Sequence, residues 1–178
     1  MLKKRKQKDL IEIVNEIGED IDSILDERKT ERYLEGIVLT YSLIENILKY
    51  TVFLKRSWDQ NCSDVDNDLP LEKISEHTEK IHKECSKYNF YKSLENAHEL
   101  GLIDDKLQSM INEIREERND MVHQFWLYAH RKNPHVLEKK LKKIVRISKK
   151  TIKPFVKLSR EIGIDEIFDV SVFFRTNQ

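Results

Sequence analysis

The segment Arg118-Asn119-x-x-x-His123 holds the side chains best suited to chemistry in this sequence. The charge of histidine changes near neutral pH, so His123 can take a proton from a ribose 2′-hydroxyl or give one to a leaving oxygen. Arg118 offers a fixed fork of donors that matches phosphate oxygens and stabilises the charge of a pentacoordinate phosphorane. Asn119 can orient the imidazole or bond the phosphate. This chemistry needs no metal ion.

The spacing of these residues on a helix indicates a site shared between two copies of the chain. Asn119 and His123 are four positions apart and are therefore neighbours on one helix face. Arg118 and His123 lie about 140° apart around a straight helix. The guanidinium and the imidazole can then meet on one phosphate through the reach of the arginine, or in a groove between two molecules. We therefore expect a homodimer.

Two opposite charges, Glu45 and Arg118, fall on apolar helix faces. Glu45 lies near the middle of an arc of about 120° that is formed by Leu34, Ile37, Val38, Tyr41, Ile44, Leu48 and Val52. Arg118 falls inside a similar apolar arc. Burying either charge alone is costly, so each needs a partner or a cavity. Two hypotheses follow: a structural Glu45–Arg118 ion pair inside the bundle, or a polar cleft in which Glu45 positions Arg118.

The elements that carry these residues are predicted from apolar periodicity. Apolar residues that recur every three to four positions predict helices over 6–30, 31–56, 70–86, 88–100, 105–129 and 134–161. The polar cluster in 57–69 predicts a loop, Gly101 suits the end of a helix, and Pro154 predicts a kink. With 4 glycines and 3 prolines, the chain has few obligatory turns. It is predicted to be all-α, an antiparallel helical bundle with four to five core helices.

The predicted domain organisation is a single domain over 1–178. Its core spans about 31–160, and residues 1–30 add an N-terminal helix. The tail, 162–178, is too apolar to be left in water, so it should pack on the body or on a second copy.

Positive charge is concentrated in one stretch of a chain whose formal net charge is zero. From Arg131 to Arg160 there are 12 Lys or Arg residues and one acid, Glu138, a local net charge of +11. Such a helix can attract phosphates, although it can also be a solvated lysine-rich face. If RNA is the partner, the candidate RNA-binding residues are Lys139, Lys142, Lys143, Arg146 and Lys150, with Trp126 as a stacking platform on the His123 side of its helix.

Composition excludes several other classes. Cys62 and Cys85 have no paired spacing, and no secretory signal is recognisable, which favours a reducing cytoplasm. We expect no apolar run to reach the roughly 20 residues of a membrane span. His77, His82 and Cys85 lack a fourth metal ligand, so no metal site or other cofactor is predicted, and Cys85 is better interpreted as a core residue.

Arg118-Asn119-x-x-x-His123 resembles the Arg-x4–6-His signature of the HEPN superfamily, in which a polar residue commonly follows the arginine. The preceding Gly101-Leu102-Ile103 and the earlier segment around Glu45 resemble the same family, so the similarity covers about 31–160. It implies a four- or five-helix bundle that dimerises with the motifs facing each other. Active members are metal-independent endoribonucleases that leave a 2′,3′-cyclic phosphate and a 5′-hydroxyl, and many are toxins or phage-defence effectors. Arg118 and His123 would be catalytic, Asn119 supporting, and Glu45 a positioning partner.

One position departs from the family pattern. Some family toxins carry a tyrosine two residues after the histidine, where this chain has Phe125. That argues against the subtype whose tyrosine is modified by a partner nucleotidyltransferase. A cognate antitoxin or a defence partner remains open. Two alternatives also stay open: a catalytically inactive dimer that binds nucleotide or RNA or acts as a protein-interaction module, and a bundle whose motif match is accidental.

Overall fold

The computed structural model describes residues 10–26, 32–123 and 134–163. These ranges contain α1 (Leu10–Asp26), α2 (Tyr33–Asp66), α3 (Leu71–Cys85), α4 (Phe90–Glu99), α5 (Asp105–His123) and α7 (Pro134–Glu161), and no strand. The all-α prediction is therefore confirmed for the described part of the chain. Predictions for Phe125, Trp126, the end of the 105–129 helix and the tail from 164 lie outside the described residues.

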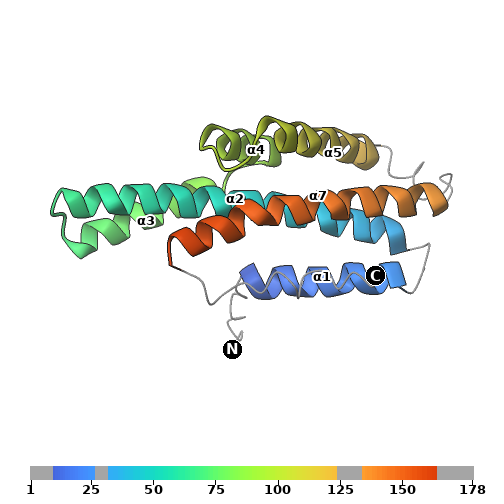
Figure 1. Ribbon diagram of the computed structural model, residues 1–178, viewed down its shortest axis with the longest axis horizontal. Helices are drawn as coiled ribbons and strands as arrows, with labels where there is room; N and C mark the ends of the chain where they lie inside the picture. Colours follow the sequence, from blue (N-terminus) through green and yellow to red (C-terminus); the bar gives the residue numbers. More distant parts are fainter. Residues whose placement is uncertain (1–9, 27–31, 124–133, 164–178) are drawn as a thin grey trace, which may run out of the picture.

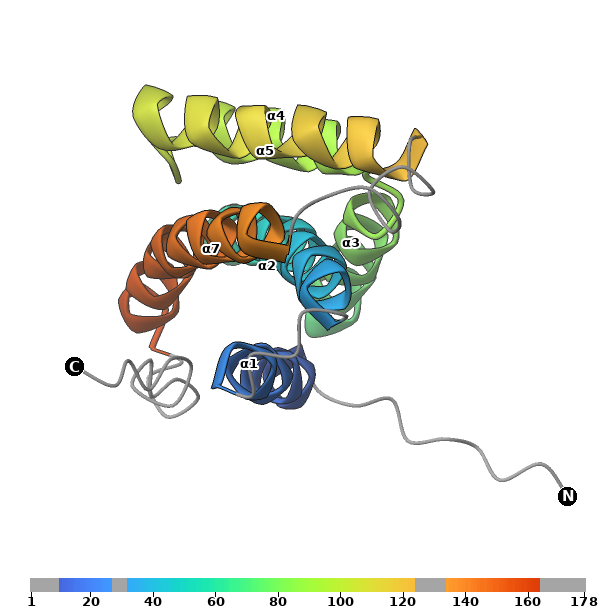
Figure 2. The same cartoon turned by 90° about the vertical axis from the view of Figure 1, so that its right-hand side faces the viewer.

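The helices form layers around the two longest, α2 and α7, which lie side by side (Figure 1). Figure 2 shows α4 and α5 stacked on one side of this pair, α1 on the opposite side, and α3 beside α2. Helix α2 contacts every other helix of the described chain, so residues on its different faces can meet α5 at one level and α3 at another.

The α2–α7 pair runs parallel, which corrects the expectation of antiparallel neighbours for the most extensive helix contact. Early in both helices, a Cβ at Gly36 would lie 3.0 Å from Cδ2 of Leu141. Later in both, the rings of Tyr50 and Phe155 are 5.6 Å apart. Short loops make consecutive helices antiparallel, but α7 reaches α2 only after the intervening helices have returned the chain to the same end.

Helix α2 extends beyond its predicted end because polar side chains one turn apart pair with each other along the helix. Lys55 and Asp59 make an ion pair of 2.6 Å one turn apart, and Gln60 donates to Asp64 at 2.8 Å. Asp64 is buried and also meets Nδ1 of His77, on α3, at 2.8 Å. The predicted loop over 57–69 was therefore wrong as far as Asp66.

Other predicted boundaries are confirmed. Gly101 has φ +67° and follows α4, with its N–H donating to His98 and that of Leu102 to Ala97, as in a Schellman ending. Helix α7 has the predicted bounds and continues through Pro154.

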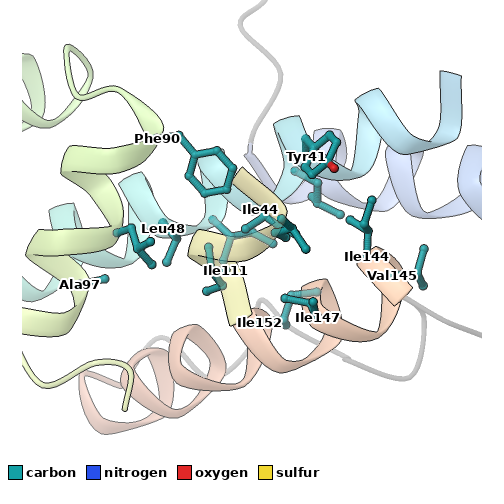
Figure 3. Packing of buried hydrophobic residues seen from close by; sticks show 14 of the residues in the cluster. Tyr41, Ile44, Leu48, Phe90, Ala97, Ile111, Ile144, Val145, Ile147 and Ile152 are labelled. Atoms are coloured by element: carbon teal, nitrogen blue, oxygen red, sulfur yellow. The ribbon is translucent and has the colours of Figure 1, made fainter. Parts of the chain in front are cut away.

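The core forms where α2 meets α4, α5 and α7. Figure 3 shows Ile44 and Leu48 of α2 close to Ile111 of α5 and Ile152 of α7. The predicted apolar stripe of α2 is buried there, with one clear departure: the side chain of Val38 is 46% exposed. Val38 lies at a pocket between α2 and α5.

Helix α2 is also the one described helix long and apolar enough to cross a membrane, with a mean hydropathy of 1.3 over an 18-residue window. This differs from the expectation that no such run exists. Half of the window is buried inside the protein, and a core helix passes the same test, so the finding is weak evidence for a membrane location.

Candidate active-site pocket

A pocket of about 220 Å³ opens between α2 and the last turns of α5. It is lined by Val38, Tyr41, Ser42 and Glu45 from α2 and by Arg118 from α5. The α2 residues recur at three- and four-residue intervals, so they share one helix face. We call this the Arg118 pocket. The two charges singled out in the sequence therefore meet at one cavity.

Glu45 forms its ion pair with Lys49 rather than with Arg118. The carboxylate and the ammonium are 2.8 Å apart, one turn apart on α2, and both side chains are less than a quarter exposed. Among the described residues, no Glu45–Arg118 ion pair is present. The hypothesis of a structural Glu45–Arg118 pair is therefore wrong, and the two charges share a pocket without neutralising each other.

Arg118 is held by its neighbour in the motif. Its Nη1 donates to Oδ1 of Asn119 at 3.3 Å, and both side chains are half-buried. A guanidinium carries five N–H donors. Within the described part of the chain this is the one hydrogen bond of the Arg118 side chain, and its other N–H donors have no described partner.

His123 is exposed at the last turn of α5 and does not line the Arg118 pocket. This agrees with its expected angular separation from Arg118 on the helix. The described chain thus brings together Glu45, Arg118 and Asn119, whereas His123 faces solvent nearby along the same helix.

The predicted basic surface is a ridge along α7, which we call the cationic ridge. Its members recur every three or four positions, are exposed, and lie opposite the buried face of the helix. They are Lys139, Lys142, Arg146, Lys150, Lys153, Lys157 and Arg160.

Acids of α5 neutralise part of the predicted RNA-binding set. Lys143 is half-buried and pairs with Glu113 at 2.7 Å and with Glu117 at 3.2 Å, while Lys140 pairs with Glu117 at 3.1 Å. Burial would raise the pKa of Glu117, but hydrogen bonds from both lysines outweigh it, so this pKa is lowered. Lys142 pairs with Glu138. Among the five predicted cations, Lys139, Arg146 and Lys150 have no ion pair with a described residue.

Sequence reasoning missed Lys49, Tyr41 and Ser42 as neighbours of the candidate charges. The signal for Lys49 was present, because it stands four positions after Glu45, the spacing of a helical ion pair. The described residues contain no group of three or more His, Cys, Asp or Glu side chains that could hold a metal ion.

Comparisons with known proteins found no matching family model, no matching curated protein and no matching solved structure.

Proposed function

We propose that this protein is a HEPN-like, metal-independent endoribonuclease that acts as a homodimer in the cytoplasm. The observation that carries the proposal is the Arg118 pocket. It joins a half-buried arginine with available donors, the Asn119 amide that holds it, and an acid that does not neutralise it. In this proposal α2, α3, α4, α5 and α7 form the HEPN-like bundle.

The proposed reaction is attack of a ribose 2′-oxygen on the adjacent phosphorus. The O2′–P bond forms as the P–O5′ bond breaks: His123 accepts the 2′-hydroxyl proton and later returns it to solvent, and the leaving 5′-oxygen takes a proton from water. Arg118 stabilises the charge that builds on the phosphoryl oxygens. The products are a 2′,3′-cyclic phosphate and a 5′-hydroxyl. The exposed cations of the cationic ridge attract RNA to this surface.

In this proposal the dimer brings a histidine to the Arg118 pocket, which no histidine of the same chain's described residues lines. His123 is exposed outside the Arg118 pocket, and the exposed Val38 gives the pocket an apolar edge that a second copy can cover. Two copies facing each other through this edge would set each imidazole near the other's guanidinium. Such an enzyme would serve as a toxin or a phage-defence effector, with a cognate antitoxin or defence partner.

A second candidate is a HEPN-like dimer that binds RNA or nucleotide without cleaving it. The position of His123 outside the pocket favours this alternative, because an arginine without a general base binds phosphate but transfers no proton.

Incubating purified protein with single-stranded RNA in EDTA distinguishes the two candidates. The first predicts cleavage that survives chelation, yields cyclic phosphate ends and disappears in His123→Ala. His98→Ala is the matched control, because this histidine lies on α4 and pairs with Asp105 instead. Binding of RNA with no cleavage supports the second candidate. Absence of both activities contradicts the first candidate and the RNA-binding form of the second.

A further inference from the structure

A second pocket of about 210 Å³ lies between α2 and α3, one turn beyond the Arg118 pocket along α2. Figure 1 shows α3 running beside the later half of α2. The residues that line the pocket come from these two helices and from Ser86, which follows α3. We call it the aromatic pocket. Its lining residues are Asn46, Lys49, Tyr50, Phe53, His82, Cys85 and Ser86.

Three rings form its walls. The Tyr50 and Phe53 ring centroids are 5.8 Å apart, and Phe53 meets His82 edge-on at 5.2 Å. The ring of Phe155, on α7, also contacts that of Tyr50, with the two centroids 5.6 Å apart. Cys85 is buried, and burial raises the pKa of its thiol, so the sulfur is a neutral, polarisable surface. These walls suit a flat, aromatic ring.

One cation and one amide give the pocket polarity. The ammonium of Lys49 has three donors, of which one points to Glu45 at 2.8 Å. The amide nitrogen of Asn46 donates to the backbone carbonyl of Ser42 at 2.9 Å, so its carbonyl oxygen is the group left to accept a hydrogen bond. A ligand matching both would carry an anionic group and a ring with an N–H donor, such as the amino group of adenine.

We propose that the aromatic pocket binds a flat aromatic ring bearing an anionic group, the chemistry of a nucleoside monophosphate. The ring stacks among Tyr50, Phe53 and His82, and the phosphate meets Lys49. The ligand is either a free nucleotide or one nucleotide unit of an RNA chain. This proposal does not depend on RNA cleavage, because it concerns a different cavity.

Glu45 and Lys49 couple the two pockets. Glu45 lines the Arg118 pocket, Lys49 lines the aromatic pocket, and their ion pair joins them across one helical turn. An anion at Lys49 competes with Glu45 for the ammonium. The released carboxylate then shares its pocket with the guanidinium of Arg118, the one cation among the residues that line it. Ligand binding in one cavity therefore changes the charge state of the other, and the coupling must be reciprocal.

Calorimetric titration of the full chain with AMP, adenosine and inorganic phosphate tests the binding site. We expect AMP to bind more tightly than either fragment. Phe53→Leu keeps apolar volume but removes a ring, so it should weaken AMP binding about tenfold. Lys49→Gln should weaken AMP binding and leave adenosine binding unchanged.

The matched controls are Tyr91→Leu on α4 and Lys55→Gln on α2, which lie outside the pocket and should bind AMP like the wild type. Thermal denaturation confirms that each variant is folded. A trinucleotide RNA that binds where AMP does not identifies an RNA unit as the ligand. Absence of binding by all of these probes, or equal binding by Phe53→Leu, Lys49→Gln and wild type, overturns the proposal.

The coupling has its own measurement, the NMR signal of the Arg118 Nε–H group. It should move when AMP, or the trinucleotide, binds the wild type and stay fixed when the same ligand binds Glu45→Gln. Because Glu45→Gln removes the competitor for Lys49, it should also bind AMP several-fold more tightly. Ligand binding that leaves the Arg118 signal unmoved in the wild type refutes the coupling.

Discussion

The polar residues in the two halves of α2 have different partners. Where α2 packs on α3 and the residues after it, polar groups bond across the interface: Arg56 donates to Glu84 at 2.9 Å and to the hydroxyl of Tyr88, and Asp64 meets His77 at 2.8 Å. Toward α5, Glu45 turns to Lys49 on its own helix and leaves Arg118 facing a cavity. Charges that pair across an interface stabilise it, whereas charges that share a cavity unpaired are available to a ligand.

The largest expected effect compares the two arginines. Arg118→Lys keeps the charge but loses the fork that matches a phosphate, so RNA cleavage should fall about a hundredfold to a thousandfold with little change in Tm. Arg56→Lys should leave cleavage unchanged and lower Tm by about 2–4 °C, because it weakens a partly exposed pair. Cleavage assays and thermal melts of both variants check this. If Arg118→Lys and Arg56→Lys lost cleavage equally, the Arg118 pocket would have no special role in the reaction.

The second prediction concerns the stability of the first half of α2, which we expect to depend on close packing against α7 and not on ion pairs between helices. There α7 approaches α2 closely, because a Cβ added at Gly36 would lie only 3.0 Å from Cδ2 of Leu141, which is fully buried. Gly36→Val should therefore destabilise the fold by about 1–3 kcal/mol through overpacking. Denaturant unfolding measures this. Glu35→Val, at the neighbouring exposed position, should change stability little. An unchanged midpoint for Gly36→Val would contradict the packing.

The sequence was sufficient for features that depend on local patterns. Apolar periodicity predicted the helices, and Gly101 predicted a left-handed ending because only a residue free of Cβ strain suits φ +67°. The Glu45 and Arg118 positions on their helices predicted that both would reach one site. The Glu45–Lys49 pair was missed because the partner of Glu45 was sought on another helix, although the i,i+4 spacing of a helical ion pair was present in the sequence.

Features that depend on distant parts of the chain could not be predicted in the same way. The polar run 57–69 has the composition of a loop, and it is helical as far as Asp66 because α3 supplies partners such as His77 and Thr78. The parallel α2–α7 contact depends on how α3, α4, α5 and the rest of the chain between them bring α7 back to the end of the molecule where α2 begins. The neutralisation of Lys143 depends on acids of α5 that pair with it only in the folded molecule.

A smaller effect is the pH dependence of the stability that Glu84 contributes where α3 packs on α2. Hydrogen bonds from Arg56 and Tyr88 lower the pKa of Glu84 from 4.5 to about 2. A lowered pKa in the folded state means that this stabilisation is present above pH 4.5 and is lost as pH falls toward 2. The Tm difference between wild type and Glu84→Gln, about 2–4 °C at neutral pH, should therefore close over that range. Glu76→Gln, exposed on the same helix, should show no such closing, and a gap that persists at pH 2 would contradict the assignment.

The smallest expected effect concerns the salt dependence of RNA binding. It tests whether a lysine without an ion pair binds RNA better than a lysine that is already paired with acids. Lys139 has no ion pair with a described residue, whereas Lys143 pairs with Glu113 and Glu117. Each lysine that releases a counterion from single-stranded RNA contributes about 0.7 to the slope of log K against log salt. Lys139→Gln should therefore lower the slope by about that amount, and Lys143→Gln should leave it nearly unchanged, since Lys143 must break two ion pairs to meet a phosphate. Titrations at several salt concentrations measure both slopes. Equal decreases would mean that RNA displaces the acids of α5, so that pairing in the free protein does not decide which cations bind.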